Sequence, residues 1–418
     1  MGNYNKIERT AAKILDAFPT FKKILKAIYQ RVNYSLYKEK GFTLNIHEDI
    51  KISSALQIKG DYFFGYYDRS PWSVDMKKMI FHKLEENNVE IILFDIESGE
   101  INVVENSVAF NFQQGSLITW INNNEFIFVD EFEGGLSSKI YNVESHTTKI
   151  VPLPVQTINN KSLLSINYSK LYDITGQYGY PNKVENFSKD LPLDKDGIWH
   201  NDLNTKKVNL LISLDTLCEN EDRKIMGNAK QKINHVMYSP SGNDFVFMHR
   251  WLGGDGKYSR LYVSDRDGKR LKILFDDRMV SHYSWKDNDH LIVWARTKEF
   301  GDRYYLVNVR TGDKQIIGEG VLDQFGDGHP SYSPNERWII TDTYPDKARQ
   351  RHLLLYDTKN EELIKLGRFF TPWKFDGPNR CDLHPRWSPD GNYISIDSAH
   401  EGNRRSYILD VSKIVKSG

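Results

Sequence analysis

The chain has 418 residues, with 56 Lys and Arg against 56 Asp and Glu, so its formal net charge is zero at pH 7. This balance gives no electrostatic reason to expect a nucleic acid as a partner. Two cysteines give no disulfide framework, no apolar run reaches the roughly eighteen residues that cross a membrane, and the amino terminus lacks a signal-peptide pattern. We therefore expect a cytoplasmic location.

Residues 1–45 differ in pattern from the rest of the chain. Apolar residues recur at helical spacing on both sides of Pro19, and basic residues lie between them. The pattern predicts an amphipathic helical extension. Two partners fit it: a protein surface, on this chain or another, or an anionic membrane on which a basic helix lies peripherally. The sequence leaves both open.

Four similar segments follow one another in the second half of the chain. They are Asn234-His235-Val236-Met237-Tyr238-Ser239-Pro240, Ser281-His282-Tyr283-Ser284-Trp285, Asp327-Gly328-His329-Pro330-Ser331-Tyr332-Ser333-Pro334 and Asp382-Leu383-His384-Pro385-Arg386-Trp387-Ser388-Pro389. Their histidines, at 235, 282, 329 and 384, are 47, 47 and 55 residues apart. A repeat of this length is the signature of propeller blades. With three similar units upstream, we predict an all-β, seven-bladed propeller with TolB- or WD40-like blades over residues 60–412.

The four repeated histidines are the first candidates for chemistry. Equivalent positions in successive blades are neighbours around the axis, so we expect His235, His282, His329 and His384 to form an arc at one mouth of the central channel. Asp327, Asp382, Gln324 and Cys381 lie close to them in the sequence. Imidazole together with oxygen or sulfur ligands suits a divalent metal, manganese or zinc. The alternative is that each histidine only fixes a turn by hydrogen bonding.

A second group of polar residues follows the predicted strands. Phe245-Val246-Phe247-Met248 is an apolar strand that ends in His249-Arg250-Trp251. A cation beside a histidine favours the neutral imidazole, which is a competent base near pH 7. His249 is therefore the candidate base, and Arg250 is its candidate assistant.

Two sets of motifs resemble known polysaccharide lyases. The segments Asn234–Pro240, Met248-His249-Arg250 and Arg260-Leu261-Tyr262 resemble the oligogalacturonate lyases, which are seven-bladed propellers. Phe64-Gly65-Tyr66-Tyr67-Asp68, Gln113-Gln114-Gly115, Tyr178-Gly179-Tyr180 and Arg380-Cys381-Asp382-Leu383-His384-Pro385 are similar to ulvan-lyase-like propellers. Together the motifs cover about residues 60–410.

The resemblance implies roles for particular residues. The oligogalacturonate lyases imply His249 as the base and His282, Gln324 and His329 as metal ligands, with Asp327 where the family has a further histidine. The ulvan-type enzymes imply Tyr178 as a catalytic tyrosine.

These residue types suit β-elimination on a uronic acid, in which a metal or Arg neutralises the carboxylate and a base removes the neighbouring proton. We expect the substrate to be an acidic oligosaccharide or polysaccharide. The candidate substrate-binding residues are Tyr66, Trp72, Trp251, Arg296 and Tyr344. The alternative is a non-catalytic propeller that binds a glycan or a protein.

Overall fold

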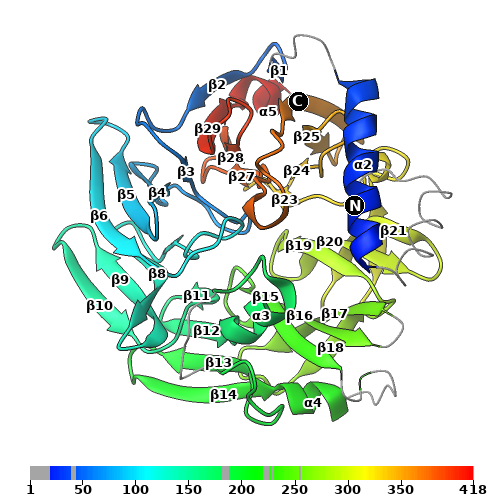
Figure 1. Cartoon of the computed structure of the whole chain (residues 1–418). Coiled ribbons are helices and arrows are strands. Elements are labelled where there is room, and N and C mark those ends of the chain that lie inside the picture. Colours follow the sequence, from blue (N-terminus) through cyan, green and yellow to red (C-terminus); the bar gives the residue numbers. More distant parts are fainter. Residues whose placement is uncertain are drawn as a thin grey trace.

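The computed structural model describes residues 19–38, 44–180, 188–219, 226, 229–253 and 256–417. Seven antiparallel sheets are arranged in a ring around a central axis (Figure 1). This confirms the predicted seven-bladed propeller. In blades four to seven the first strand of each sheet lies nearest the axis (Figure 1).

The first four blades each contain four consecutive strands. Blade one consists of β3 (Tyr62–Phe63), β4 (Lys78–Leu84), β5 (Val89–Asp95) and β6 (Ile101–Ser107). Blade two consists of β7 (Thr119–Trp120), β8 (Glu125–Phe132), β9 (Gly135–Asn142) and β10 (Thr147–Val151). Blade three consists of β11 (Thr157–Asn159), β12 (Ser162–Ile166), β13 (Gly197–Asp202) and β14 (Lys207–Ser213). Blade four consists of β15 (Lys230–Tyr238), β16 (Asp244–Gly253), β17 (Gly256–Asp265) and β18 (Leu271–Phe275).

The last two blades recruit strands from the start of the chain. Blade five is regular, with β19 (Val280–Trp285), β20 (His290–Thr297), β21 (Gly301–Asn308) and β22 (Lys314–Ile317). Blade six consists of β23 (Ser331–Tyr332), β24 (Trp338–Asp342), β25 (Gln350–Asp357) and β26 (Glu362–Phe370), extended by β1 (Asn45–Ile46). Blade seven consists of β27 (Arg386–Trp387), β28 (Tyr393–Ser398) and β29 (Arg405–Asp410), completed by β2 (Lys51–Ser54).

Strand β2 closes the ring. It pairs with β29 from Lys51 opposite Asp410 to Ser54 opposite Tyr407, so the first and last parts of the propeller share one sheet. Residues 46–59, which lay between the predicted extension and the predicted propeller, therefore contain a strand of blade seven.

The Ser-Pro segments form tight turns between the first and second strands of their blades. In blade seven the Ser388 amide donates to the Tyr393 carbonyl at 2.9 Å, and the Gly391 amide donates to the Ser388 carbonyl at 3.0 Å. Gly391 has φ +70°, a conformation that glycine adopts without strain. Glu336 holds the same place in blade six at φ +60°. The turn geometry is thus preserved even where glycine is replaced.

Few helices accompany the strands. They are α2 (Pro19–Tyr37), α3 (Tyr168–Thr175), α4 (Leu214–Glu219), α5 (Ser412–Ser417) and the 3-10 turns η2 (Asp323–Phe325) and η3 (Gly377–Asn379). Helix α2 belongs to the predicted extension, whose part before residue 19 lies outside the described residues. Within the described ranges, no helix has the length and apolarity to span a bilayer.

Helix α2 packs against blade six (Figure 1). The Tyr34 ring lies 6.1 Å from that of Phe370 and 5.6 Å from that of Trp373, and the Arg31 guanidinium lies 5.4 Å from the Trp373 ring. The helix thus contacts the propeller through a few aromatic side chains and forms no part of a sheet.

Deletion of residues 1–43 should leave a folded propeller, because it removes α2 and keeps β1 and β2. We expect the melting temperature to fall by no more than about 5 °C. Deletion of residues 1–54 also removes the strand that closes the ring and should lower it by more than about 10 °C or prevent folding. Thermal unfolding followed by circular dichroism distinguishes the two; similar melting temperatures for both truncations would contradict the role given to β2.

Candidate functional site

The four repeated histidines surround a pair of tyrosines. The ring of His329 lies 4.2 Å from that of His282 and 4.3 Å from that of His384. The Tyr66 ring lies 5.1 Å from both His235 and His384, and the Tyr67 ring lies 5.1 Å from His329. We call these histidines the histidine arc. All four are at least nine-tenths buried.

The local backbone explains why the arc forms. The β15–β16 ladder shifts register between Asn234 and Met237, and the β19–β20 ladder shifts between Val280 and Tyr283. His235 and His282 lie at these bulges, and His235 and His384 have positive φ angles of +54° and +44°. A bulge redirects a side chain out of the alternation of a strand. These bulges therefore turn His235 and His282 toward the axis.

The segment Phe64–Arg69 enters the channel mouth from blade one. The carboxylate of Asp397 accepts hydrogen bonds from the amides of Phe64 (3.1 Å) and Gly65 (3.0 Å). Gly65 has φ +122°, and a Cβ there would lie 2.8 Å from the Gln114 carbonyl, so only glycine fits. This anchored segment carries Tyr66 to the centre of the arc.

Three arc histidines have their Nδ1 atoms fixed by oxygen acceptors. The Nδ1 atoms lie 2.9 Å from Asp327 in His282, 2.7 Å from Asp342 in His329 and 2.8 Å from the Gly65 carbonyl in His384. In a neutral imidazole, a proton on Nδ1 leaves a lone pair on Nε2. The Nε2 atoms of His329 and His384 are buried and have no hydrogen-bond partner. This arrangement is typical of histidines that bind metals.

Burial keeps the imidazoles of His282 and His384 neutral. It lowers the pKa of His282 to about 4 against the opposing effect of Asp327, and it lowers the pKa of His384 well below its ordinary value. Metal ligation by histidine requires the neutral form. His282 and His384 are therefore in the form that can bind a cation at pH 7.

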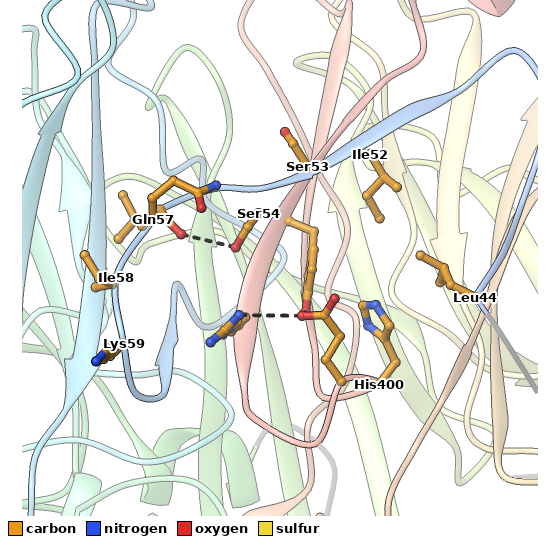
Figure 2. A pocket seen from close by; sticks show the side chains of 12 residues that line it. Leu44, Ile52, Ser53, Ser54, Gln57, Ile58, Lys59 and His400 are labelled. Carbon is orange, nitrogen blue, oxygen red and sulfur yellow. Dashed lines mark hydrogen bonds and ion pairs between the residues drawn. The ribbon is translucent and has the colours of Figure 1, made fainter.

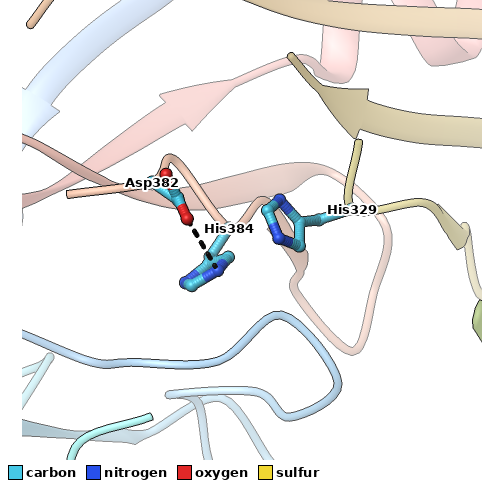
Figure 3. Close-up of side chains that lie close together, drawn as sticks. All are labelled: His329, Asp382 and His384. Atoms are coloured by element: carbon cyan, nitrogen blue, oxygen red, sulfur yellow. Dashed lines mark ion pairs between the residues drawn. The ribbon is translucent and has the colours of Figure 1, made fainter. Parts of the chain in front are cut away.

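Asp382 brings a carboxylate to the same place. Ligand atoms of His329, Asp382 and His384 lie within 4.8 Å of one another (Figure 3). Burial alone would raise the pKa of Asp382, but Arg351 at 2.6 Å and Arg380 at 2.7 Å hold it well below its ordinary value. The group thus combines imidazole nitrogens with an ionised carboxylate, a donor set that suits manganese or zinc.

Two of the four ligands predicted from the sequence face each other, and two lie elsewhere. His282 and His329 are adjacent in the arc. Asp327 lies behind His282, with its carboxylate on the Nδ1 atom of that ring and on the Ser281 hydroxyl at 2.7 Å. Gln324 is exposed in η2, where its amide donates to the Gly320 carbonyl.

His235 has a different environment from the other arc histidines. Its Nε2 atom lies 3.4 Å from the Asp68 carboxylate, its ring stacks on Tyr283 at 4.4 Å, and its Nδ1 atom is buried without a hydrogen-bond partner. Burial lowers the pKa of His235, while Asp68 opposes this shift. With a proton on Nε2 facing Asp68, Nδ1 is a free base.

Arg380 organises the polar groups beside the arc. Its guanidinium donates to Asp382 at 2.7 Å, to the Gln177 side chain at 2.8 Å and to the Tyr178 hydroxyl at 3.0 Å. It also lies 5.8 Å from the Tyr344 ring. Arg380 was not among the predicted site residues, although it lies two residues before Asp382 in the repeated segment.

The predicted tyrosines meet near Arg380. The Tyr66 ring lies 6.1 Å from Tyr178, and Tyr344 lies 6.2 Å from His329. Burial raises the pKa of Tyr66 and of Tyr344 well above the ordinary value, so both hydroxyls keep their protons at neutral pH. The structure therefore brings Tyr66, Tyr178 and Tyr344 to the arc.

Three other predicted substrate-binding residues have partners of a different kind. Trp72 is 4% exposed in the apolar core of blades one and two. Trp251 stacks on Tyr258 at 5.1 Å, and exposed Arg296 pairs with Asp302 at 2.6 Å. None of these contacts involves the arc.

His249 is buried within blade four. Its Nε2 atom lies 2.7 Å from the Gln231 side chain, and its ring lies 5.1 Å from Trp251. Burial lowers its pKa to about 3. Its described hydrogen bonds and ring contacts are with blade four residues, whereas Arg250 on the opposite face donates to the Val280 carbonyl of blade five at 3.0 Å.

A surface pocket of about 420 Å³ lies beside β2 of blade seven (Figure 2). Two of its polar side chains are paired: the Tyr407 hydroxyl donates to Glu401 at 2.8 Å, and His400 bonds to Ser398 at 2.9 Å. Cys381 is likewise not a ligand, because it packs with Phe375 and Ala399 and burial raises its pKa to about 11. The arc remains the candidate site.

Comparison with known proteins supports the fold. No protein-family model and no curated protein sequence matches the chain. Among solved structures, an oligogalacturonate lyase from Vibrio parahaemolyticus is 15% identical, has a TM-score of 0.64, and is matched over 90% of this chain and 98% of its own. An oligogalacturonate lyase in complex with manganese is 14% identical, has a TM-score of 0.63, and is matched over 91% and 99%. The chain thus has the propeller fold of the oligogalacturonate lyases, which confirms the resemblance at the level of the fold.

Lower pH should destabilise the protein, because His282 has a lower pKa in the folded state than in the unfolded state, where it is near 6.5. Its contribution is fully present above pH 6.5 and is lost as pH falls toward 4. The loss at pH 5 is on the order of 2 kcal/mol. We expect urea unfolding of the wild type to show this slope and the His282→Gln variant to show a shallower one. An equal slope in both proteins would contradict the assignment.

Proposed function

We propose that the chain is a lyase that cleaves oligosaccharides or polysaccharides containing uronic acids by metal-assisted β-elimination. The observation that carries this proposal is the arrangement of the arc, in which Nδ1 atoms are held by oxygen acceptors and the Nε2 atoms of His329 and His384 are buried without hydrogen-bond partners. A purely structural histidine gains nothing from an unpartnered buried nitrogen.

The proposed metal ligands are His282, His329 and His384, with Asp382 beside them. A divalent cation bound there, manganese or zinc, would supply positive charge at the substrate carboxylate and make the neighbouring C–H more acidic. Asp327, Asp342 and the Gly65 carbonyl orient the rings through Nδ1. Arg380 adds a second positive charge beside the arc.

We assign the base to His235 in place of His249. His235 lies in the arc, and Asp68 next to its Nε2 atom stabilises the imidazolium that forms when Nδ1 takes the proton. His249 has its contacts inside blade four. Tyr66 retains its proton because of its raised pKa, so its hydroxyl can protonate the departing oxygen.

The proton and electron changes balance as follows. The substrate C–H proton passes to His235, the C–O bond to the leaving sugar breaks, and Tyr66 protonates that oxygen. The product carries a carbon–carbon double bond beside the carboxylate. Return of the proton from His235 to Tyr66, through water, restores the site.

The alternative remains a non-catalytic propeller that binds an acidic glycan or a protein. The same cationic groups, Arg380 and a bound metal, would serve such binding. Turnover decides between the two functions, because only a lyase releases an unsaturated uronate.

Replacing His235 with Ala should lower kcat by about 10²–10⁴-fold while bound metal stays at the wild-type level, since the change removes a base and no ligand. Replacing His329 with Ala should remove both metal and activity. Elemental analysis and the ultraviolet absorbance of unsaturated uronates, over a panel of acidic oligosaccharides, measure the two effects. His290→Gln, at the start of β20 in blade five, is the matched control.

Three results would count against this scheme. Wild-type metal and activity in both variants would make the arc structural. A wild-type protein that binds metal and acidic oligosaccharides without turnover would support the binding propeller. Loss of activity in a His249→Ala variant that keeps its fold, with an active His235→Ala variant, would return the base to His249.

A further inference from the structure

Two cationic side chains lie next to each other on one face of blade four. Lys232 on β15 is directly opposite Arg250 on β16, and Arg250 is opposite Ser259 on β17. Residues directly opposite in a ladder point to the same face of the sheet. This face meets blade five, where the Arg250 guanidinium donates to the Val280 carbonyl at 3.0 Å, two residues before His282.

Lys232 is buried and Arg250 is half-buried, and the pair has no counter-charge among the described residues. Lys232 is only 7% exposed, and the Nε atom of Arg250 is buried without a hydrogen-bond partner. Neither side chain forms an ion pair with any residue that the structure describes. Buried cations without an anion are costly to the folded state. Burial, together with Arg250 and Lys257, lowers the pKa of Lys232 to about 7.

The same face leads toward the arc. Asn234 follows Lys232 on the same side of β15, and its side-chain oxygen is also buried without a partner. Its carboxamide can also donate hydrogen bonds. Arg250 is among the groups that lower the pKa of His235, although burial and Asp68 have larger effects. The electrostatic effect of Arg250 therefore extends to the arc. An anion held by Lys232 and Arg250 would therefore lie close to the proposed base.

We propose that Lys232 and Arg250 bind a second oxyanion of the substrate, a carboxylate or a sulfate ester, on a sugar unit next to the one that is cleaved. This inference rests on the proposed function and names its substrate class: oligosaccharides with acidic groups on neighbouring units. A guanidinium and an ammonium on the same face of the sheet would give such an anion two charge-assisted hydrogen bonds.

The first test uses sodium sulfate and sodium acetate as probes, with sodium chloride at matched ionic strength. Both probes should raise the melting temperature of the wild type, and Lys232→Met should weaken their binding by roughly tenfold or more. Without anions, Lys232→Met should be at least as stable as the wild type, because it removes an unpaired buried charge and keeps the stem. Lys269→Met, at an exposed lysine, is the control.

The second test uses a galacturonate trimer and the same trimer with the carboxylate next to the cleaved unit esterified. Lys232→Met should raise KM for the first and leave KM for the second unchanged. Preference for sulfate over acetate in the first test would identify a sulfated sugar. Equal responses of wild type and Lys232→Met to both probes and both trimers would overturn the inference.

The two proposals can fail separately. Anion binding that depends on Lys232, without turnover of any uronate, would keep this site and remove the lyase. Turnover that is unaffected by Lys232→Met would keep the lyase and remove this site.

Helix α2 carries an independent feature. Its exposed apolar residues lie four apart on one face: Ile24, Ile28, Val32 and Leu36, which are 54%, 53%, 52% and 74% exposed. Tyr34 contacts blade six from another side of the helix. Residues 19–38 contain five Lys or Arg and no acidic residue.

We propose that this face of α2 lies on an anionic lipid surface, with the apolar row in the boundary region and the exposed Lys26 and Lys38 near the headgroups. The occupant is inferred from charge complementarity, since a cationic amphipathic helix favours anionic lipids. The exposed row alone would suit any apolar partner.

Co-sedimentation with vesicles tests this inference. The full chain should bind phosphatidylcholine vesicles that contain phosphatidylserine, bind weakly to phosphatidylcholine alone, and dissociate as salt is raised. Ile28→Ser combined with Val32→Ser should abolish binding, whereas Ile150→Ser, exposed on β10, should not. The absence of vesicle binding would overturn the inference, as would self-association through the same residues.

Discussion

The carbonyl and amide of Gly65 form the junction on which the site depends. The amide donates to Asp397, and the carbonyl accepts from His384 and Arg386, all three on blade seven. These bonds connect the first blade to the last at the channel mouth, while β2 connects them at the outer edge. A side chain at residue 65 would collide with Gln114, so this close approach needs glycine. Tyr66 lies at the centre of the arc because the preceding residue is held in this way.

The same junction couples fold and chemistry. His384 uses Nδ1 to hold the segment that carries Tyr66, and this bond leaves its Nε2 atom available. Asp342 has a similar double role, because it bonds to Nδ1 of His329 and to the amide of His384. Ring orientation in the arc is thus a product of the contacts between neighbouring blades. The ligands of the proposed metal site come from blades five, six and seven without any loop dedicated to that purpose.

The blade repeat could be predicted from the sequence because similar segments recur at nearly constant intervals. The intervals between histidines predicted four blade repeats and placed His235, His282, His329 and His384 at equivalent positions, and three similar units upstream completed the predicted count of seven blades. Strand alternation also predicts that His249 is buried. It follows Phe245 and Phe247 at steps of two, so its side chain shares their buried face. Arg250, one residue later, faces blade five. His249 and Arg250 are adjacent in the sequence, but the two-residue period of a strand places their side chains on opposite faces of the sheet.

Other features had no periodic signal. Gln324 and Asp327 lie in an irregular segment before β23, where side-chain direction follows from turn geometry that spacing does not reveal. Arg380 and Tyr178 are about two hundred residues apart in the sequence. They meet only because the segment between β12 and β13 of blade three reaches the segment before blade seven. Which ring nitrogen of each histidine is free depends on Asp327, Asp342 and Gly65, whose positions follow from the assembled ring. Contacts of this kind are set by tertiary structure.

The closure of the ring by β2 has a consequence for synthesis of the chain. Strand β2 is made before any of the seven blades is complete, but its partner β29 belongs to the last blade. While the intervening blades are made, β2 stays unpaired, and an unpaired strand is prone to association with other chains. Closing a loop of this length is entropically slow. Closure of the ring, and with it assembly of the arc, therefore waits until blade seven has been made.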